Sequence, residues 1–450
     1  MLKKNEIYKT EILDISNEGS GVCRIDGFTV FVPDTAVGDI ADVRIVKALK
    51  SYGYGIIENL IVPSPYRAEN DCGVYKKCGG CCYRHMTYEE ECRVKLKQVK
   101  DAFRRIGGFD IEAEGILAAE SIYGYRNKAQ LPVSAGEMGA AAGFFAKRSH
   151  RLIECADCAL TPKIFGEITK EVLRFLNEHK IKPYDEQSGK GLVRHIYLRT
   201  SGDLKSIMLC LVCTSERLPE KEKFAACITE KFPEIKTVVI NVNSRRTNVI
   251  LGGRSITLCG EGYITDTMCG NKVRISPQSF YQVNLRQAQR LYRKAEQYAG
   301  LAGGETLLDL YCGIGTIGLS MAKSVRKLIG VEIVPQAVEN ARINARINGI
   351  ENSEFFCGDC SDAAKRFESE GLSPDVAILD PPRKGCDGQV IESVAAMAPK
   401  KVVMISCNPA TAARDCKLIC GKGYRLERFA AVDMFPRTAH CECVVLMTRA

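Results

Sequence analysis

A cysteine that ends an apolar segment is the first candidate for chemistry in this chain. Residues 402–415 read VVMISCNPATAARD, so Cys407 follows five mostly apolar residues and precedes Asn-Pro and a run of small residues. A thiolate is a strong nucleophile when its surroundings activate it, and such catalysis also needs a separate proton acceptor. Glu442, in the segment PRTAHCE, begins the last apolar segment and is the candidate acceptor. A buried structural thiol and a surface carboxylate are the simpler interpretations of these two residues.

A second set of residues is typical of a nucleotide pocket. The segment Asp309–Gly315 (DLYCGIG) holds a G-x-G turn, in which Gly313 and Gly315 let the backbone approach a ligand closely. The third glycine of the dinucleotide fingerprint is missing, which argues against NAD. Three acidic residues each end a later predicted strand, where a carboxylate can bind ribose hydroxyls or simply cap a helix. They are Glu332, Asp359 and Asp380.

Clustered cysteines form a third candidate site. Cys72, Cys78 and Cys81 lie close together, and Cys158 follows far downstream. Four thiolates suit either a [4Fe-4S] cluster or tetrahedral zinc, and the spacing alone does not separate the two. Two further cysteines, at positions 82 and 155, are near enough to take a ligand's place. Four unliganded thiols are the simplest alternative.

The elements that must position these residues divide the chain into three regions. Residues 1–60 hold short β-branched runs separated by Gly and Asp turns, which predict a small OB-like barrel. Residues 61–275 form a mixed α+β region with a basic helix that ends near Ile106. Residues 276–450 alternate strands and helices, which predicts a doubly wound α/β fold with a mainly parallel sheet and a final antiparallel pair.

Composition bounds the class of protein. A chain of 450 residues with 46% hydrophobic and 26% charged residues is typical of an ordinary multidomain protein. The net charge of +9 is compatible with a nucleic-acid partner without requiring one. No segment has the length of a membrane span, and MLKKNEIYKT has no apolar stretch of a leader, so we expect a cytoplasmic protein with no membrane contact. The 22 cysteines are therefore expected to be reduced.

Taken together, the α/β region resembles a class I S-adenosylmethionine-dependent methyltransferase. The motifs SCNPATAARD, LDPPRKG, DMFPRTAHCE and ISPQSFYQVN are similar to those of the RNA uracil-5-methyltransferase family, which acts on tRNA or 23S ribosomal RNA. The resemblance implies that Cys407 is the nucleophile and Glu442 the proton acceptor. It implies that S-adenosylmethionine binds at eight residues: Gln282, Tyr311, Gly313, Gly315, Thr316, Glu332, Asp359 and Asp380.

The resemblance extends to the N-terminal regions. Residues 1–60 are similar to the TRAM module, an RNA-binding OB-like domain. The ribosomal branch of the family carries a [4Fe-4S] cluster at C-x5-C-G-x-C with a later cysteine, a pattern that Cys72, Cys78, Cys81 and Cys158 match. We therefore expect an rRNA methyltransferase, monomeric, that acts on a flipped uridine in single-stranded or loop RNA.

Three alternatives remain open. The first is the same reaction on tRNA, and the second is a non-catalytic RNA-binding Fe–S protein. The third is an Fe–S oxidoreductase that uses the sheet for a dinucleotide, which the incomplete G-x-G motif disfavours.

Overall fold

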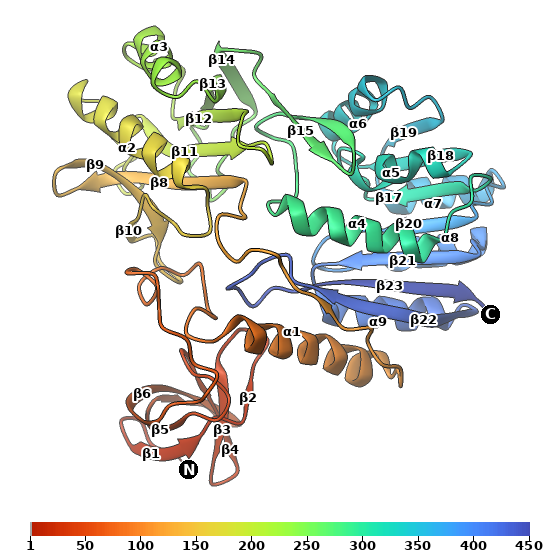
Figure 1. The fold of residues 1–450 in the computed structure, drawn as a ribbon, viewed down its shortest axis with the longest axis horizontal. Helices are drawn as coiled ribbons and strands as arrows, with labels where there is room; N and C mark the ends of the chain where they lie inside the picture. The colour runs from red at the N-terminus through yellow and green to blue at the C-terminus, as the bar shows by residue number, and fades with distance from the viewer. Residues whose placement is uncertain (1) are drawn as a thin grey trace.

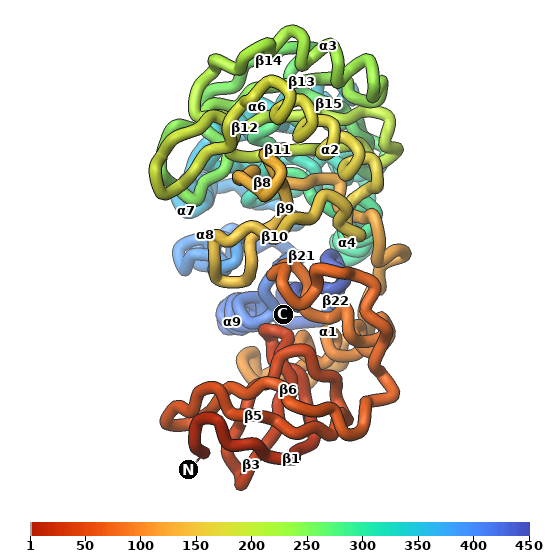
Figure 2. The backbone as a smooth tube through the Cα atoms, turned by 90° about the vertical axis from the view of Figure 1, so that its left-hand side faces the viewer, coloured from red at the N-terminus to blue at the C-terminus, as the bar shows by residue number. Residues whose placement is uncertain are grey.

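The computed structural model describes residues 2–450 and shows three β-sheets of six, seven and eight strands with one separate hairpin (Figure 1). The N-terminal sheet and the central sheet lie at opposite ends of the molecule in both views (Figure 2). No helix described between residues 2 and 450 is both long and apolar enough to cross a bilayer. The cytoplasmic location and the monomeric state stay predictions.

The N-terminal sheet has the strand order β1-β5-β6-β4-β3-β2. Alternate residues of its strands face a small apolar core, and that alternation is the pattern of a sheet with one solvated face. The last strand ends two residues beyond the predicted boundary at residue 60. The strands are β1 (Ile7–Glu11), β2 (Asp14–Ile15), β3 (Gly21–Ile25), β4 (Phe28–Val32), β5 (Ile40–Ala48) and β6 (Tyr52–Val62).

The central sheet has the order β10-β9-β8-β11-β12-β13-β14, with two helices packed against it. A hairpin of β15 (Ile264–Met268) and β16 (Asn271–Ile275) leads from it to the last domain. The elements are β8 (Lys128–Gly136), β9 (Gly139–Phe145), β10 (Leu152–Glu154), α2 (Lys163–Glu178), β11 (Val193–Thr200), β12 (Ile207–Cys213), α3 (Lys221–Lys231), β13 (Ile235–Val242) and β14 (Arg254–Cys259).

The third sheet confirms the predicted doubly wound α/β fold. Its order is β19-β18-β17-β20-β21-β23-β22-β7, and its first five strands are parallel. The final pair, β22 and β23, is antiparallel as predicted. The strands are β17 (Thr306–Leu310), β18 (Lys327–Glu332), β19 (Ser353–Cys357), β20 (Val376–Leu379), β21 (Lys401–Ser406), β22 (Tyr424–Val432), β23 (Glu442–Arg449) and β7 (Ile116–Leu117).

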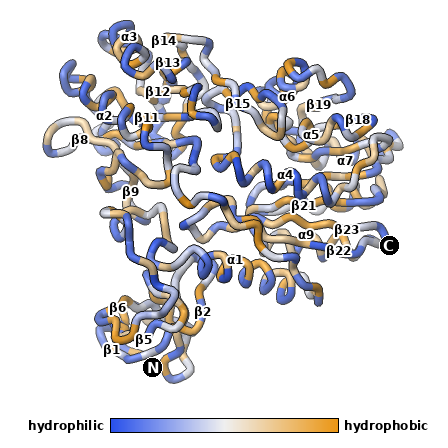
Figure 3. Tube along the Cα trace, in the orientation of Figure 1, coloured by the Kyte–Doolittle hydropathy of each residue, from blue (hydrophilic) through white to orange (hydrophobic). Residues whose placement is uncertain are grey.

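Helices cover both faces of this sheet and bury two apolar clusters. The inner strands of the sheet are mostly apolar along their whole length because both faces are covered. Helix α4 carries many hydrophilic residues (Figure 3). One face carries α4 (Leu285–Ala299), α5 (Thr316–Met321) and α6 (Pro335–Ile347). The other carries α7 (Cys360–Ser369), α8 (Gly388–Met397), α9 (Pro409–Cys420) and α1 (Tyr88–Ala102).

Helix α1 differs from the predicted division of the chain. The sequence placed it in the central region, but it packs on α9 of the third domain and continues as a π-helical turn at Phe103–Gly107. Strand β7 likewise joins the third sheet by pairing with β22. The Thr87 side chain caps α1 by accepting from the Glu90 N–H at 3.4 Å, as the capping-box spacing predicts. Helix α1 therefore bridges the N-terminal sheet and the third domain (Figure 1).

Candidate active site

The strand topology brings Cys407 and Glu442 together. Strand β21 ends at Ser406, β23 begins at Glu442, and the antiparallel register pairs Ser406 with Cys443. The next pair in that register sets Cys407 opposite Glu442, at the carboxyl end of β21. Ligands of open α/β sheets bind at this edge. The two residues predicted to do chemistry are thus neighbours, although 35 positions of sequence separate them.

The turn after β21 holds Cys407 in a defined position. The Asn408 side chain caps α9 by accepting from the Ala410 N–H at 3.1 Å, and Pro409 takes the first helical position. The Asn408 amide also donates to the Arg383 carbonyl at 3.1 Å. This contact ties the Asp380-Pro-Pro-Arg turn to the cysteine turn.

Burial dominates the electrostatics of the site. It raises the pKa of Glu442 to about 8, with the Asp380 carboxylate adding to the effect and Arg383 opposing it. Burial likewise raises the pKa of Asp380 to about 7. The pKa of Cys407 is raised by burial and by both carboxylates, again against Arg383. Within residues 2–450, no group donates a hydrogen bond to the Glu442 or Asp380 carboxylate. Neither carboxylate therefore has a donor among these residues that would stabilise its ionised form.

The glycine turn lies at the end of β17, two strands from Cys407. Tyr311, Gly313 and Gly315 all have positive φ, at 65°, 57° and 81°, and this is a strained conformation for the tyrosine. A Cβ at position 313 would meet no atom within 4 Å, so the backbone there faces open space. The Gly313 N–H donates to Glu332 at 3.1 Å, which fixes that carboxylate at the end of β18. This open turn beside a fixed carboxylate fits an adenosine-type ligand.

The other predicted cofactor residues differ in their exposure and in the contacts that they make. Thr316 shares a hydrogen bond of 3.2 Å with the Tyr292 hydroxyl at the start of α5. Asp359 is exposed and caps α7 through the Ser361 N–H at 2.8 Å, which was its simpler interpretation. Gln282 is buried, and its backbone carbonyl accepts from Asn127 at 3.0 Å. Their contact with a cofactor stays a prediction.

Two further residues belong to the site. Tyr292 of α4 is buried where the Asp380 and Glu442 carboxylates both raise its pKa, after burial as the main cause. Arg383 is the cation nearest the reactive pair, and it lies 3.4 Å from His440. The position of Arg383 directly after Asp380-Pro-Pro could have indicated its role from the sequence. Tyr292 had no such signal, because it occupies the apolar face of an amphipathic helix.

A groove of about 520 Å³ opens onto the Cys407 turn. Its walls come from three parts of the chain that are far apart in sequence. The N-terminal sheet supplies Phe31, the α1 segment supplies Lys97 and Arg105, and the third domain supplies Cys407 and Arg383. Asp14 and Asp101 also line the groove, where both pair with Lys97 and Asp101 also pairs with Arg105. The aromatic ring and the Arg383 cation beside Cys407 are suited to RNA with exposed bases.

The predicted cysteine ligands line a separate pocket of about 270 Å³. Among the described residues 2–450, no three Cys, His, Asp or Glu side chains are grouped closely enough to hold a metal ion. Cationic side chains at positions 84, 126 and 128 share the pocket wall. Burial, with the nearby thiols adding to it, raises the pKa of Cys155 to about 12. Five cysteines line the pocket: Cys72, Cys78, Cys81, Cys155 and Cys158.

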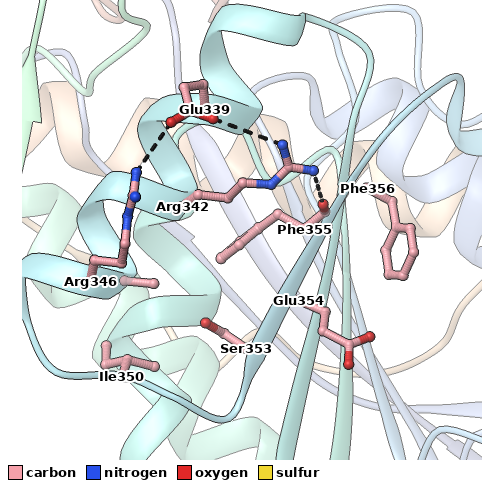
Figure 4. A pocket seen from close by; sticks show the side chains of 9 residues that line it. Glu339, Arg342, Arg346, Ile350, Ser353, Glu354, Phe355 and Phe356 are labelled. Atoms are coloured by element: carbon pink, nitrogen blue, oxygen red, sulfur yellow. Dashed lines mark hydrogen bonds and ion pairs between the residues drawn. The ribbon is translucent and has the colours of Figure 1, made fainter.

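A larger surface pocket, of about 590 Å³, lies between α6 and β19, away from the reactive pair (Figure 4). Its arginines, Arg342 and Arg346, both pair with Glu339. Because its charges are satisfied internally and neither Cys407 nor Glu442 reaches it, it is not the candidate active site.

The fold and this edge define a class I methyltransferase, and comparisons with known proteins agree. Residues 254–450 match the tRNA (uracil-5-)-methyltransferase family, and residues 2–57 match the TRAM domain. An RNA methyltransferase of uncharacterised function from Bacillus cereus is 41% identical over all of this chain and 98% of its own length. One from Clostridium acetobutylicum is 42% identical with the same coverage.

A solved structure extends the likeness to three dimensions. The tRNA (uracil-54, C5)-methyltransferase of Pyrococcus abyssi, in complex with S-adenosyl-L-homocysteine, has a TM-score of 0.79 and 27% identity. The match covers 98% of this chain and 99% of that one. The chain therefore belongs to the RNA (uracil-5-)-methyltransferase family, with an N-terminal TRAM domain, and it is an RNA methyltransferase.

Proposed function

We propose that the enzyme transfers a methyl group from S-adenosylmethionine to C5 of a uridine in RNA, with Cys407 as nucleophile and Glu442 as general base. The observation that carries this proposal is the strand register that sets Glu442 opposite Cys407, which lines the groove. The likeness to a uracil-C5 methyltransferase supports it.

The chemistry follows from the poor nucleophilicity of C5 in uracil. The Cys407 thiolate adds to C6, and the electron pair of the C5–C6 bond moves to C5, which takes the methyl group. Glu442 then accepts the C5 proton, the ring double bond re-forms, and the C6–S bond breaks to return the thiolate. The proton on Glu442 passes to solvent, so the enzyme is restored.

The raised pKa values give this site a definite pH response. Because Glu442 must be ionised to accept a proton and its pKa is about 8, the fraction of competent enzyme increases as pH rises from 6 to 9. The Cys407 thiolate increases in the same direction. We expect kcat/KM, measured by tritium release from 5-tritiated uridine RNA, to increase over this range. A flat profile would contradict the assignment of Glu442.

Residues at the carboxyl edge would hold S-adenosylmethionine. The positive-φ turn at Tyr311–Gly315 would contact the methionine part, and Glu332 the ribose hydroxyls. Asp380, Thr316, Gln282 and Asp359 complete the proposed set. The sulfonium supplies an activated methyl group and a positive charge beside the reactive pair.

We further propose 23S ribosomal RNA as the substrate and a [4Fe-4S] cluster in the cysteine pocket. Five cysteines and a cationic wall suit an anionic cluster chemically, and the thiols would have to come closer together than they lie in the structure to bind it. Cys72, Cys78, Cys81 and Cys158 would be the ligands, with zinc as the alternative. Iron, sulfide and zinc analysis of anaerobically purified protein distinguishes these, and zinc without iron would exclude the cluster.

Transfer RNA is the second candidate substrate, because the solved relative from Pyrococcus abyssi is a tRNA enzyme. That structure matches 98% of this chain, so the N-terminal domain does not separate the two substrates. Mapping of 5-methyluridine in ribosomal and transfer RNA from cells with and without the gene decides between them.

The decisive test of the mechanism is Cys407→Ala. We expect methylation to be lost, and covalent trapping by 5-fluorouridine RNA to be lost with it, because no C6–S bond can form. Binding of S-adenosylhomocysteine should be retained, since the glycine turn is unaffected. Methylation at the wild-type rate in this variant would reject the proposal.

A further inference from the structure

The segment that leads into the proposed base, residues 433–441 between β22 and Glu442 of β23, is called the catalytic loop. It is held from outside its own domain. Helix α1 and the residues that follow the cysteines contact it along most of its length, whereas Cys407 is held by α9 and the Arg383 turn. Glu442 is also paired with Val432 of β22, and its neighbour Cys443 with Ser406 of β21, so these outside contacts add to the support that the sheet gives the base.

Four buried charged side chains form the first support. Lys95 of α1 lies 2.7 Å from both the Glu91 and Asp433 carboxylates, and it also donates to the Phe435 carbonyl at 3.1 Å. The Arg437 backbone N–H donates to Glu91 at 2.6 Å. All four charged side chains are 8% exposed or less, and two positive charges balance two negative ones. Such a balanced cluster is costly to disturb.

Arg437 is the residue at which this support meets the cysteine region. Its carbonyl accepts from the backbone N–H groups of Cys82 and Tyr83, at 2.9 and 3.2 Å. Cys82 directly follows Cys81, which lines the cysteine pocket. The Arg437 guanidinium donates to the Met86 carbonyl at 3.0 Å. Its φ of 71° is a strained value for a residue with a side chain, so these contacts must hold it there.

A second contact joins the same two regions. The Tyr125 hydroxyl donates to the Pro436 carbonyl at 2.9 Å, and the next residue, Arg126, lines the cysteine pocket. Two separate segments, residues 81–83 and residues 125–126, therefore connect the pocket wall to the catalytic loop. In each segment, the residue that lines the pocket is next in sequence to a residue that contacts the loop.

We propose that Arg437 is a positioning residue for Glu442, and that the cysteine site acts in the reaction by holding residues 81–83 against Arg437. This inference rests on the proposed role of Glu442 as the base. It assigns the cysteine pocket a task that needs no electron transfer: the residues next to its wall keep the catalytic loop in place.

The expected failure is specific to one step. A displacement of the base by about 1 Å is enough to slow a reaction on the order of 100-fold. Because Cys407 has its own support, addition to C6 and methyl transfer should proceed when the loop shifts, while removal of the C5 proton slows. The enzyme should then accumulate as a covalent adduct with ordinary, methylated RNA.

Arg437→Met tests this, with Arg437→Lys as a second variant that keeps the charge. Arg425→Met is the matched control, because Arg425 is an exposed arginine of β22 that pairs only with Glu427. Turnover and the adduct with uridine RNA are measured together on denaturing gels. We expect about 10- to 100-fold slower turnover with adduct accumulation for Arg437→Met, a smaller effect for Arg437→Lys, and neither for the control.

The outcomes separate this inference from the function on which it rests. If wild-type enzyme forms no adduct with 5-fluorouridine RNA, the proposed mechanism itself fails. If it does, and folded Arg437→Met or Arg437→Lys enzyme either turns over normally or slows without adduct, the positioning role is wrong. Should Arg437→Met not fold, the lysine variant decides.

The cysteine half has a readout independent of activity. Hydrogen exchange of the anaerobically purified protein is compared with that of Cys81→Ser. We expect exchange at residues 433–441 to be about tenfold faster in the variant, with no change at the glycine turn of residues 311–315. Unchanged exchange in the catalytic loop overturns the coupling between the cysteine site and Arg437.

Discussion

Two groups of buried charged residues lie at the two ends of the catalytic loop, and they differ in how their charges are paired. At its start, Asp433 belongs to a cluster in which each carboxylate has a cation or a hydrogen-bond donor within 3.5 Å. At its end, Glu442 faces Asp380 and Cys407, and no residue between 2 and 450 donates a hydrogen bond to either carboxylate.

This difference separates structural from reactive burial. The carboxylates beside Lys95 keep it charged, raising its pKa although burial alone would lower it. Burial without a partner instead raises the pKa of Glu442 to about 8, where a group can take up and release protons near neutral pH. Burial also raises the pKa of Glu91, against the effect of Lys95, so the two groups differ in the partners of their carboxylates and not in the direction of this shift.

The largest expected effect comes from removing the unpaired carboxylate. Glu442→Gln should lower turnover about 10³-fold, within the range for a general base, because no group remains to accept the C5 proton. Trapping by 5-fluorouridine RNA should persist, since it needs only Cys407 and methyl transfer. Multiple-turnover methylation of uridine RNA and covalent trapping by 5-fluorouridine RNA measure the two effects. Full turnover in the variant would remove the distinction between the two groups.

Removal of a charge from the paired cluster should lower the unfolding free energy of the protein. Lys95→Met leaves two buried carboxylates with Arg437 alone, and breaking such a buried pair costs about 3 to 5 kcal/mol of unfolding free energy. Urea unfolding measures it. The control is Lys97→Met on the same helix, whose partners Asp14 and Asp101 are partly exposed and whose loss should cost below about 1 kcal/mol. Equal losses would contradict the assignment of a structural role to the cluster.

Removal of the Glu442 carboxylate should change the unfolding free energy in the opposite direction, toward higher stability. Because the pKa of Glu442 is higher in the folded chain than its ordinary 4.5, folding is penalised as pH rises above about 4.5, and the penalty is complete near 8. Glu442→Gln should therefore stabilise the protein at pH 8 by on the order of 2 to 4 kcal/mol, and not at pH 4. Thermal unfolding at both pH values checks this, and a variant less stable at pH 8 would refute it.

The smallest effect concerns the exposed cations of the groove. Lys97→Ala and Arg105→Ala should each make the dependence of log K on log salt shallower by about 0.7 for single-stranded RNA, through loss of one phosphate contact. Fluorescence anisotropy across a salt series measures it. Lys422→Ala, remote from the groove, is the control. An unchanged slope would remove these two residues from the RNA path.

Much of the fold, and the placing of the candidate residues at one edge of the sheet, could be predicted from local sequence. Apolar runs with turn residues and helix caps determine strands and helices over a few positions, so the alternation after residue 276 was readable. Cys407 and Glu442 could be chosen as candidates because each lies at the end of a predicted strand, and ligands of open α/β sheets bind at the carboxyl edge. The cysteine spacing also indicated one site, and its members line one pocket.

The charge pattern of the sequence did not show which charged residues are buried. The sequence predicts a basic helix that ends near Ile106, and basic helices usually face solvent, yet Lys95 within it is fully buried. Nothing within α1 distinguishes Lys95 from Lys97. The partner that does so, Asp433, is 338 positions away. Tyr292 was missed for the same reason, since its neighbours Asp380 and Glu442 come from other strands.

The sequence by itself determined which elements form and which residue types stand at their ends, because backbone conformation and capping are local. Tertiary structure alone decided which carboxylates are paired and which are not. Whether a charge finds a partner depends on elements that meet only on folding, and that pairing sets whether a buried group is a structural contact or a proton acceptor.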